Sequence, residues 1–176
     1  MSRRTVLSLV AFVSLAMAVL GCGISCRTST VVSTTPTVDI IQQRGTVLVG
    51  TTGDYRPLSY KEPETGEYWG FDLDVAGEIA RTLNVTVSYV PTSWPTLSAD
   101  VQDPTLFDFA IGGITITDTR LAAPLLDKPF TRGQIGVLMR KGQDDLLDIV
   151  NATVRQMKAD GSLKALHEKY GLQYAF

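Results

Sequence analysis

Two apolar runs constrain the fold of this chain more than any other feature of its sequence. Residues 46–51 (TVLVGT) are rich in β-branched side chains and do not alternate between apolar and polar ones. Strands of this kind lie inside a sheet that is covered on both faces. Residues 107–111 form a second such run, which ends at Gly112 and Gly113. The two runs predict a sheet with helices packed on both sides.

Helical patterns alternate with the strands along the chain. Residues 72–83 repeat apolar side chains at a four-residue spacing, and Asp72 and Asp74 lie in the first turn, where carboxylates favour the helix dipole. Further helices are expected at residues 38–43, 94–101, 144–158 and 163–170, and further strands at residues 85–90 and 135–139. This order predicts an α/β domain with a mainly parallel sheet flanked by helices.

The first 21 residues are typical of an export signal. Arg3 and Arg4 precede an apolar run at residues 6–20, which is short for a membrane span. Removal of this segment would leave 14 basic against 18 acidic residues, a mildly acidic chain. Such a chain lacks the charge that nucleic-acid binding requires, and it has no basic face for anionic lipids.

The export signal ends in Gly21-Cys22, which resembles the lipobox of bacterial lipoproteins. Cys22 would then be lipidated and would anchor the chain to a bacterial membrane, in the periplasm or at the cell surface. Plain secretion, with Cys22 and Cys26 as incidental or disulfide-bonded thiols, is the alternative. Residues 22–37 are rich in Ser and Thr and are expected to form a tether, and residues 38–176 the folded domain.

Several kinds of chemistry find no support in the sequence. The only histidine is His167, which lies between charged neighbours and is expected to be a solvated helix residue. A histidine-based catalytic triad is therefore excluded. Two cysteines near the start of the mature chain predict no zinc site, and no phosphate-binding loop is present, so no metal or cofactor is expected.

Three loops at the predicted carboxyl ends of the strands carry side chains suited to a small zwitterion. Ligands of parallel sheets bind at these ends. The candidate ligand-binding residues offer aromatic faces, hydroxyls, a backbone that a ligand can approach and one guanidinium, and they are Asp54, Tyr55, Trp94, Gly113, Thr115 and Arg120. The alternatives are structural: Asp54 as a turn former, Trp94 as a packing residue and Arg120 as a surface ion-pair partner of Asp118.

Three motifs that follow one another in order resemble a known family. Residues 70–75 (GFDLDV), residues 108–120 (DFAIGGITITDTR) and the C-terminal stretch from residue 136 to 171 resemble the polar-amino-acid solute-binding proteins of bacteria, which have the type 2 periplasmic-binding fold. Residues 50–55 and 91–97 are most similar to the cyclohexadienyl dehydratase branch of that superfamily. The resemblance covers residues 38–176.

The resemblance implies roles for the candidate residues. Arg120 would bind the ligand carboxylate, and Thr115 with the backbone at Gly113 would accept an ammonium or hydroxyl group. Trp94 and Tyr55 would line the pocket. Asp54 would orient a polar group of the ligand.

The chain departs from the family in one respect. Family members have two lobes, whereas no second α/β unit follows Arg120 in this sequence. Residues 38–124 are therefore interpreted as the N-terminal part of a single lobe and residues 125–176 as the segment that returns to it. In the dehydratase relatives the resemblance places an essential acid on the second lobe, so catalysis is not expected here.

The leading expectation is an exported, lipid-anchored solute-binding protein of the ABC-importer type, reduced to one lobe. It would bind an amino acid or a related carboxylate weakly, with a permease as its protein partner. One alternative is a prephenate or arogenate dehydratase that becomes active when two chains pair as a homodimer. The other is a degenerate or structural lobe that folds but binds no small molecule.

Overall fold

The computed structural model describes residues 36–115 and 136–174. The predicted export signal, Cys22 and Arg120 lie outside the described residues. The first described helix begins at Thr37, one residue before the predicted start of the folded domain.

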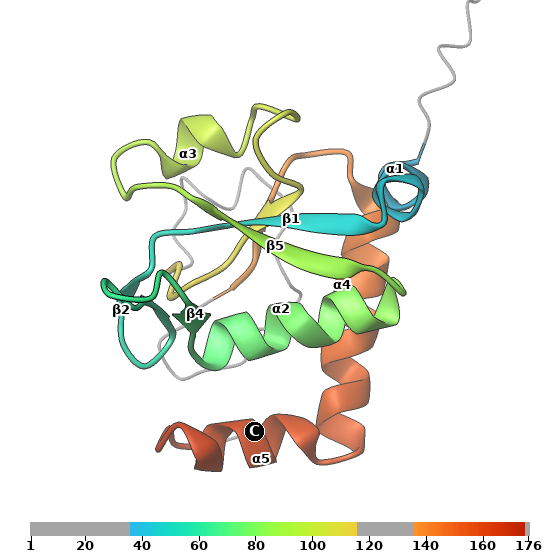
Figure 1. The fold of residues 1–176 in the computed structure, drawn as a ribbon. Coiled ribbons are helices and arrows are strands. Elements are labelled where there is room, and N and C mark those ends of the chain that lie inside the picture. The colour runs from blue at the N-terminus through green and yellow to red at the C-terminus, as the bar shows by residue number, and fades with distance from the viewer. Residues whose placement is uncertain (1–35, 116–135, 175–176) are drawn as a thin grey trace, which may run out of the picture. The chain divides into compact units, whose positions relative to one another are not determined.

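The central sheet has four strands in the spatial order β5-β1-β6-β7. Strand β1 (Thr46–Thr51) pairs in parallel with β5 (Thr86–Pro91) on one side and with β6 (Phe109–Ala110) on the other. Strand β7 (Leu138–Met139) is antiparallel to β6. Three neighbouring parallel strands confirm the predicted α/β class, and β7 makes the sheet mixed (Figure 1).

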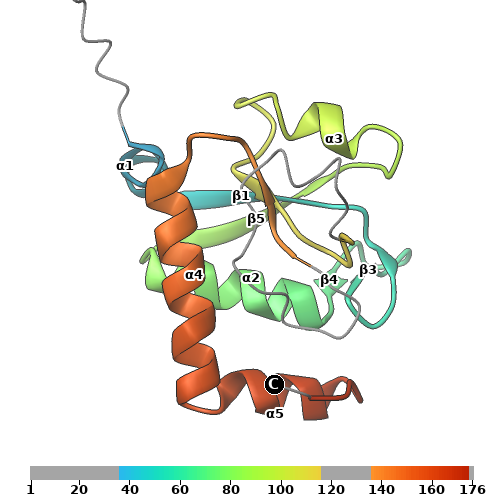
Figure 2. The same ribbon diagram turned by 180° about the vertical axis from the view of Figure 1, so that it is seen from behind.

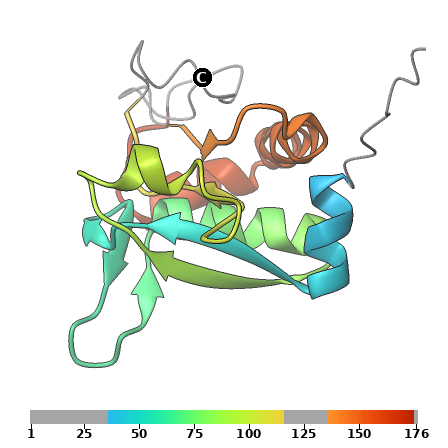
Figure 3. The same cartoon turned by 90° about the horizontal axis from the view of Figure 1, so that it is seen from above.

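Five helices accompany the sheet in the described part of the chain. They are α1 (Thr37–Arg44), α2 (Phe71–Thr82), α3 (Leu97–Asp100), α4 (Asp144–Ala159) and α5 (Ser162–Lys169). Figure 3 shows β1 in cyan and β5 in green running side by side, with α2 along them. Within residues 36–115 and 136–174, no helix combines the length and the apolar character that a bilayer span requires.

Alternate residues of the strands enter two cores on opposite faces of the sheet. Val47 and Val49 point into the larger core with side chains of α2, α4 and α5, whereas Leu48 packs at the smaller core next to α3. Gly50 allows the ring of Phe107 to lie against β1, because a Cβ atom at this position would be 2.7 Å from the ring. Sheet strands covered on both faces explain the uninterrupted apolar run in the sequence.

The C-terminal elements α4 and α5 pack against the early elements of the chain. Figure 2 shows α4 in front of the sheet and leading into α5, and α5 contacts α2. Thr153 Oγ1 on α4 hydrogen-bonds to Thr82 Oγ1 on α2 over 3.1 Å, and the backbone N–H of Val38 donates to Asp145 Oδ2 over 2.7 Å. Residues 36–115 and 136–174 therefore share one core and form a single lobe.

A second, three-stranded antiparallel sheet corrects the sequence interpretation, which placed a loop after residue 51. Its strands are β2 (Asp54–Tyr55), β3 (Ser59–Lys61) and β4 (Tyr68–Trp69), in this spatial order. Strands of two or three residues are too short to show a period in the sequence. Other boundaries shift as well: α3 covers only Leu97–Asp100, and β6 and β7 are shorter than predicted.

The prediction that His167 is solvated is wrong. Its side chain is fully buried and lies edge-on against Phe71, with ring centroids 4.5 Å apart, and against Tyr174 at 5.1 Å. The Nδ1 atom lies 2.8 Å from the carbonyl oxygen of Leu163. The reason is the helical spacing, because His167 follows the buried Leu163 by one turn of α5 and shares its inward face.

Candidate functional site

The carboxyl ends of the three parallel strands meet at one edge of the sheet. Strand β1 ends at Thr51, β5 at Pro91 and β6 at Ala110. Ligands of open α/β sheets bind outside this edge, in the loops that follow the strands. The three loops predicted to carry the ligand-binding residues start here.

Two aromatic side chains and a carboxylate come together in these loops. The indole Nε1–H of Trp94 donates to the carboxylate of Asp54, at 3.1 Å from Oδ1 and 3.2 Å from Oδ2. The ring of Tyr55 is oriented edge-on toward Trp94, with centroids 6.4 Å apart. Tyr55 is 47% exposed and Trp94 36% exposed. Both rings are thus held in place while part of their surface stays open to solvent.

Gly113 joins the third loop to this group. A Cβ atom at Gly113 would lie 2.2 Å from Cδ1 of Tyr55, so the tyrosine ring packs directly on the glycine backbone. Gly113 also has a φ of 77°, which favours glycine. Four of the six predicted ligand residues, Asp54, Tyr55, Trp94 and Gly113, are therefore linked by contacts, and we refer to them as the edge cluster.

The other two predicted residues are not part of this cluster in the described structure. Thr115 lies two residues beyond Gly113 and is exposed. Arg120 lies outside the described residues, so its binding of a carboxylate stays a prediction. The ligand roles of the four cluster residues also stay predictions, since their geometry shows proximity and not binding.

Sequence reasoning missed the role of Asp72, which lies directly behind the edge cluster. Its side chain is fully buried, and its Oδ2 atom accepts a 2.6 Å hydrogen bond from the backbone N–H of Gly113. Burial raises the pKa of Asp72 to about 7, although the backbone amides of Gly113 and Gly112 act in the opposite direction. The sequence placed Asp72 correctly in the first turn of α2, with a structural role at the helix dipole, but its burial was not predicted.

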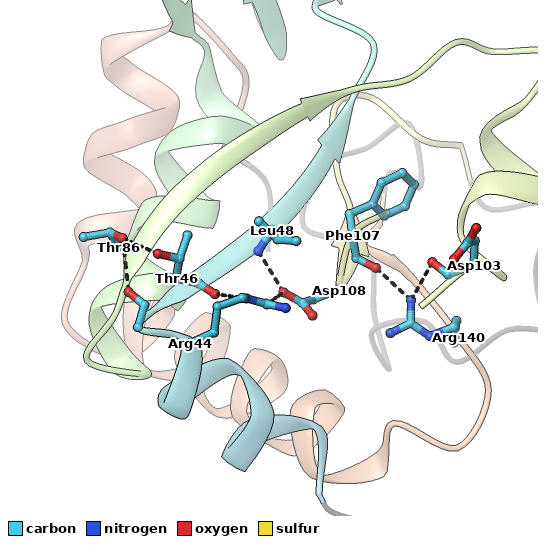
Figure 4. A network of polar contacts seen from close by, with 9 residues as sticks. Arg44, Thr46, Leu48, Thr86, Asp103, Phe107, Asp108 and Arg140 are labelled. Atoms are coloured by element: carbon cyan, nitrogen blue, oxygen red, sulfur yellow. Dashed lines mark hydrogen bonds and ion pairs between the residues drawn. The ribbon is translucent and has the colours of Figure 1, made fainter. Parts of the chain in front are cut away.

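A different set of polar contacts lies toward the amino ends of the same strands (Figure 4). The carboxylate of Asp108 pairs with Arg44 and accepts the backbone N–H of Leu48 over 2.7 Å. Burial raises the pKa of Asp108, while the Leu48 amide and the Arg44 guanidinium act against the shift. Arg140 Nη1 donates to the carbonyl oxygen of Phe107 over 2.7 Å. These charges are satisfied by groups of the chain itself.

Potential metal ligands are not grouped in the described part of the chain. Residues 36–115 and 136–174 hold no group of three or more His, Cys, Asp or Glu side chains placed to bind an ion. The edge cluster instead offers two partly exposed aromatic rings and one carboxylate. These groups suit an organic ligand that carries a positive charge.

Comparison with known proteins identifies relatives of two functional types. Cyclohexadienyl dehydratase of Pseudomonas aeruginosa is 42% identical over 95 residues, which make up 54% of this chain and 35% of that protein. An L-cystine-binding protein of Escherichia coli is 34% identical over 104 residues, 59% of this chain and 38% of that protein. The chain thus spans somewhat more than a third of the length of these curated relatives.

A solved structure of a single domain is matched over almost its whole length. The arginine-bound form of domain 1 from TmArgBP superimposes with a TM-score of 0.62 at 34% identity, covering 67% of this chain and 98% of that domain. The family model for bacterial extracellular solute-binding proteins, family 3, matches residues 47–173, which include both described segments from β1 to α5. This chain belongs to family 3 of the bacterial extracellular solute-binding proteins.

Proposed function

We propose that this chain is the ligand-binding lobe of an exported receptor for an amino acid or a related carboxylate, serving an ABC importer. The observation that supports the proposal best is the edge cluster. Asp54, Tyr55, Trp94 and Gly113 gather where a ligand of this fold binds, in a chain of a solute-binding family. Arginine bound to an isolated domain 1 shows that one lobe of a related protein holds an amino acid.

The chemistry of the cluster suggests how an amino acid would lie. The exposed faces of Tyr55 and Trp94 would pack against the ligand side chain, and the Asp54 carboxylate would face its positive charge. The Gly113 carbonyl and the Thr115 hydroxyl are oxygen acceptors that would bind an ammonium. Arg120 would take the ligand carboxylate in a bidentate pair.

One lobe forms one wall of a binding site, and we expect weak binding for this reason. Pockets that hold ligands tightly bury most of the ligand surface. A small ligand that leaves one side in solvent has few contacts with which to offset the entropy of association. We therefore expect dissociation constants on the order of 0.1–1 mM.

Calorimetric titration of residues 27–176 tests the proposal. L-arginine, L-cystine, L-glutamine and prephenate form a suitable panel. At least one should bind, and Arg120→Ala should weaken that binding about tenfold or more, since a lost charged hydrogen-bond pair costs more than 1.4 kcal/mol. Arg81→Ala is the matched control, because Arg81 is exposed on α2 and pairs there with Glu78. Absence of heat with the whole panel would instead favour a degenerate or structural lobe.

We propose further that Cys22 carries the lipid that anchors the receptor. The support is the lipobox-like sequence that precedes it. Mass spectrometry of the full-length protein expressed in a bacterium should find acyl chains on Cys22, and Cys22→Ser should release the protein from membranes. Retention of the Cys22→Ser variant in the membrane fraction would refute this anchor.

A second candidate function is supported by the similarity to cyclohexadienyl dehydratase. The active form would need a second wall, which a second copy of the chain could supply as a homodimer. Purified protein should then convert prephenate to phenylpyruvate, with a specific activity that rises with protein concentration. A monomer that shows no turnover would exclude this function.

A further inference from the structure

We propose that Asp72 is a positioning residue of the ligand site: its buried carboxyl group holds the Gly112–Gly113 turn under the edge cluster, without touching the ligand. This inference rests on the proposed function. Its first support is the 2.6 Å hydrogen bond from the Gly113 N–H to Asp72 Oδ2, which joins the first turn of α2 to the loop after β6. The two residues are 41 positions apart in the sequence.

The turn is confined on two sides. A Cβ atom at Gly112 would lie 2.8 Å from both Thr51 Oγ1 and Ser59 Oγ, so the glycine backbone rests against two buried hydroxyls. On the other side the Gly113 backbone meets the ring of Tyr55. Gly112 and Gly113 have φ angles of 136° and 77°, which favour glycine. A small change at Asp72 therefore shifts the turn or the Tyr55 ring.

Three polar atoms under the turn lack partners among the described residues. Thr51 Oγ1, Ser59 Oγ and the Oδ1 atom of Asp72 are buried, and none of them has a hydrogen-bond partner within residues 36–115 and 136–174. A fold selected for stability alone would place apolar side chains here, because buried polar atoms without partners are costly. Such costs concentrate at sites that serve a function.

The surroundings of Asp72 make its charge state sensitive to the turn. The nearest carboxylate on its own helix, Asp74, is engaged by Lys169 and Tyr170. The backbone N–H of Asp72 donates to the carbonyl oxygen of Leu58, next to β3, over 3.0 Å, and the turn contributes two backbone amides. Burial raises the pKa of Asp72 to about 7, so its protonation changes near neutral pH.

The test measures two properties: the pH titration of the Gly113 amide and the affinity for the ligand. In ligand-free protein, the Gly113 amide resonance in two-dimensional NMR should titrate in the wild type with a midpoint near the Asp72 pKa of about 7. The titration should be lost in Asp72→Asn and kept in Asp74→Asn, the matched control two residues along α2. For the best ligand of the panel, Asp72→Ala should weaken binding about tenfold. Asp72→Asn retains an acceptor oxygen and should weaken it about threefold or less.

Contrary results are equally clear. A Gly113 resonance that ignores pH in the wild type, or Asp72→Ala protein that binds as tightly as the wild type, would overturn the inference. If Asp72→Ala does not fold, Asp72→Asn tests the inference instead. The ligand affinity of the wild type should depend on pH between pH 6 and about 8, and that of Asp72→Asn should not. The same pH dependence in both proteins would refute the positioning role of Asp72. If no ligand binds the wild type, the proposed function fails, while the Gly113 titration still judges whether Asp72 holds the turn.

Discussion

The two edges of the central sheet differ in how completely their polar groups are hydrogen-bonded. Toward the amino ends of the strands, Arg44 and Asp108 pair with each other and with the backbone, and Arg140 donates to carbonyl oxygens. At the carboxyl ends, Tyr55 and Trp94 are partly exposed, and the buried hydroxyls of Thr51 and Ser59 find no partner in the part of the chain that the structure describes. The first edge is complete in itself, whereas the second has unused recognition groups.

Because of this difference, one edge of the lobe contributes mainly to folding stability and the other mainly to ligand binding. A network whose donors and acceptors satisfy one another gives a ligand nothing to bind, and its loss destabilises the fold. Exposed rings and a carboxylate at a strand end cost little to alter in terms of folding but provide the contacts for a ligand. Substitutions at the two edges should therefore have separable effects.

The largest effect on folding is expected for Asp108→Ala. The substitution leaves the Leu48 N–H and the Arg44 guanidinium without their acceptor, and we expect the free energy of unfolding to fall by about 3 kcal/mol. Urea denaturation followed by circular dichroism measures it. Asp39→Ala on the exposed first turn of α1 is the control and should cost less than about 1 kcal/mol. Equal losses in the two variants would remove the distinction between the edges.

The next effect is a pH dependence that originates at the carboxyl edge. The pKa of Asp72 is raised by burial from 3.8 to about 7, so the folded state holds a proton that the unfolded state releases. This contribution to stability is complete below the unfolded pKa and is lost as the pH rises through the folded pKa. We expect Asp72 to lower the free energy of unfolding by about 2–3 kcal/mol between pH 5 and about 8.

The measurement is the difference between the wild type and Asp72→Asn in urea denaturation across that pH range. The wild type should lose more stability than the variant as the pH rises. Parallel pH profiles for the two proteins would mean that Asp72 is not buried as the structure has it.

A smaller loss of stability is expected for Arg140→Met. Methionine retains the apolar stem, but the 2.7 Å hydrogen bond to the Phe107 carbonyl is lost, which should cost about 1–2 kcal/mol. The neighbouring Lys141 is exposed, and Lys141→Met should change stability by less than about 0.5 kcal/mol. Thermal unfolding distinguishes the two variants. A ligand affinity that changes in Arg140→Met would show that the edges are coupled.

The smallest change in folding, but a clear change in binding, is expected for Trp94→Phe. The variant loses the Nε1–H bond to Asp54 at an exposed position, so stability should change by less than about 0.5 kcal/mol. Ligand affinity should fall about three- to tenfold, because the carboxylate and the ring lose their fixed orientation. Trp69→Phe is the matched control, since Trp69 is similarly exposed but packs against Tyr60 on β3. Titration calorimetry compares them.

The sequence predicted the helices and strands that are long enough to show a repeating apolar pattern. It did not predict the shortest elements. Helices α2 and α4 were placed within one or two residues, because their apolar positions repeat over three or more turns. The β2–β3–β4 sheet was missed, since strands of two or three residues carry no readable alternation. Its pairing depends on contacts between segments, such as the ring of Tyr60 against Trp69.

The candidate site was predicted in outline, and its support was not. The strand order brought Asp54, Tyr55, Trp94 and Gly113 to one edge, as the rule for parallel sheets requires. The helical spacing of the sequence could have predicted that Asp72 is buried, but this prediction was not made. Asp72 precedes Ala76 by four residues and so lies on the inward stripe of α2, whereas Asp74 lies on its outer face.

Chemical-shift mapping tests the central claim most directly, that the carboxyl edge binds an amino acid. Residues 27–176, labelled with ¹⁵N, are titrated with the members of the ligand panel. Saturable shifts should appear at the Trp94 indole and at the Tyr55 and Gly113 amides, while the Thr46 and Thr86 amides at the opposite edge stay in place. Saturable shifts centred on Thr46 and Thr86, or no saturable shift with any ligand, would contradict the account.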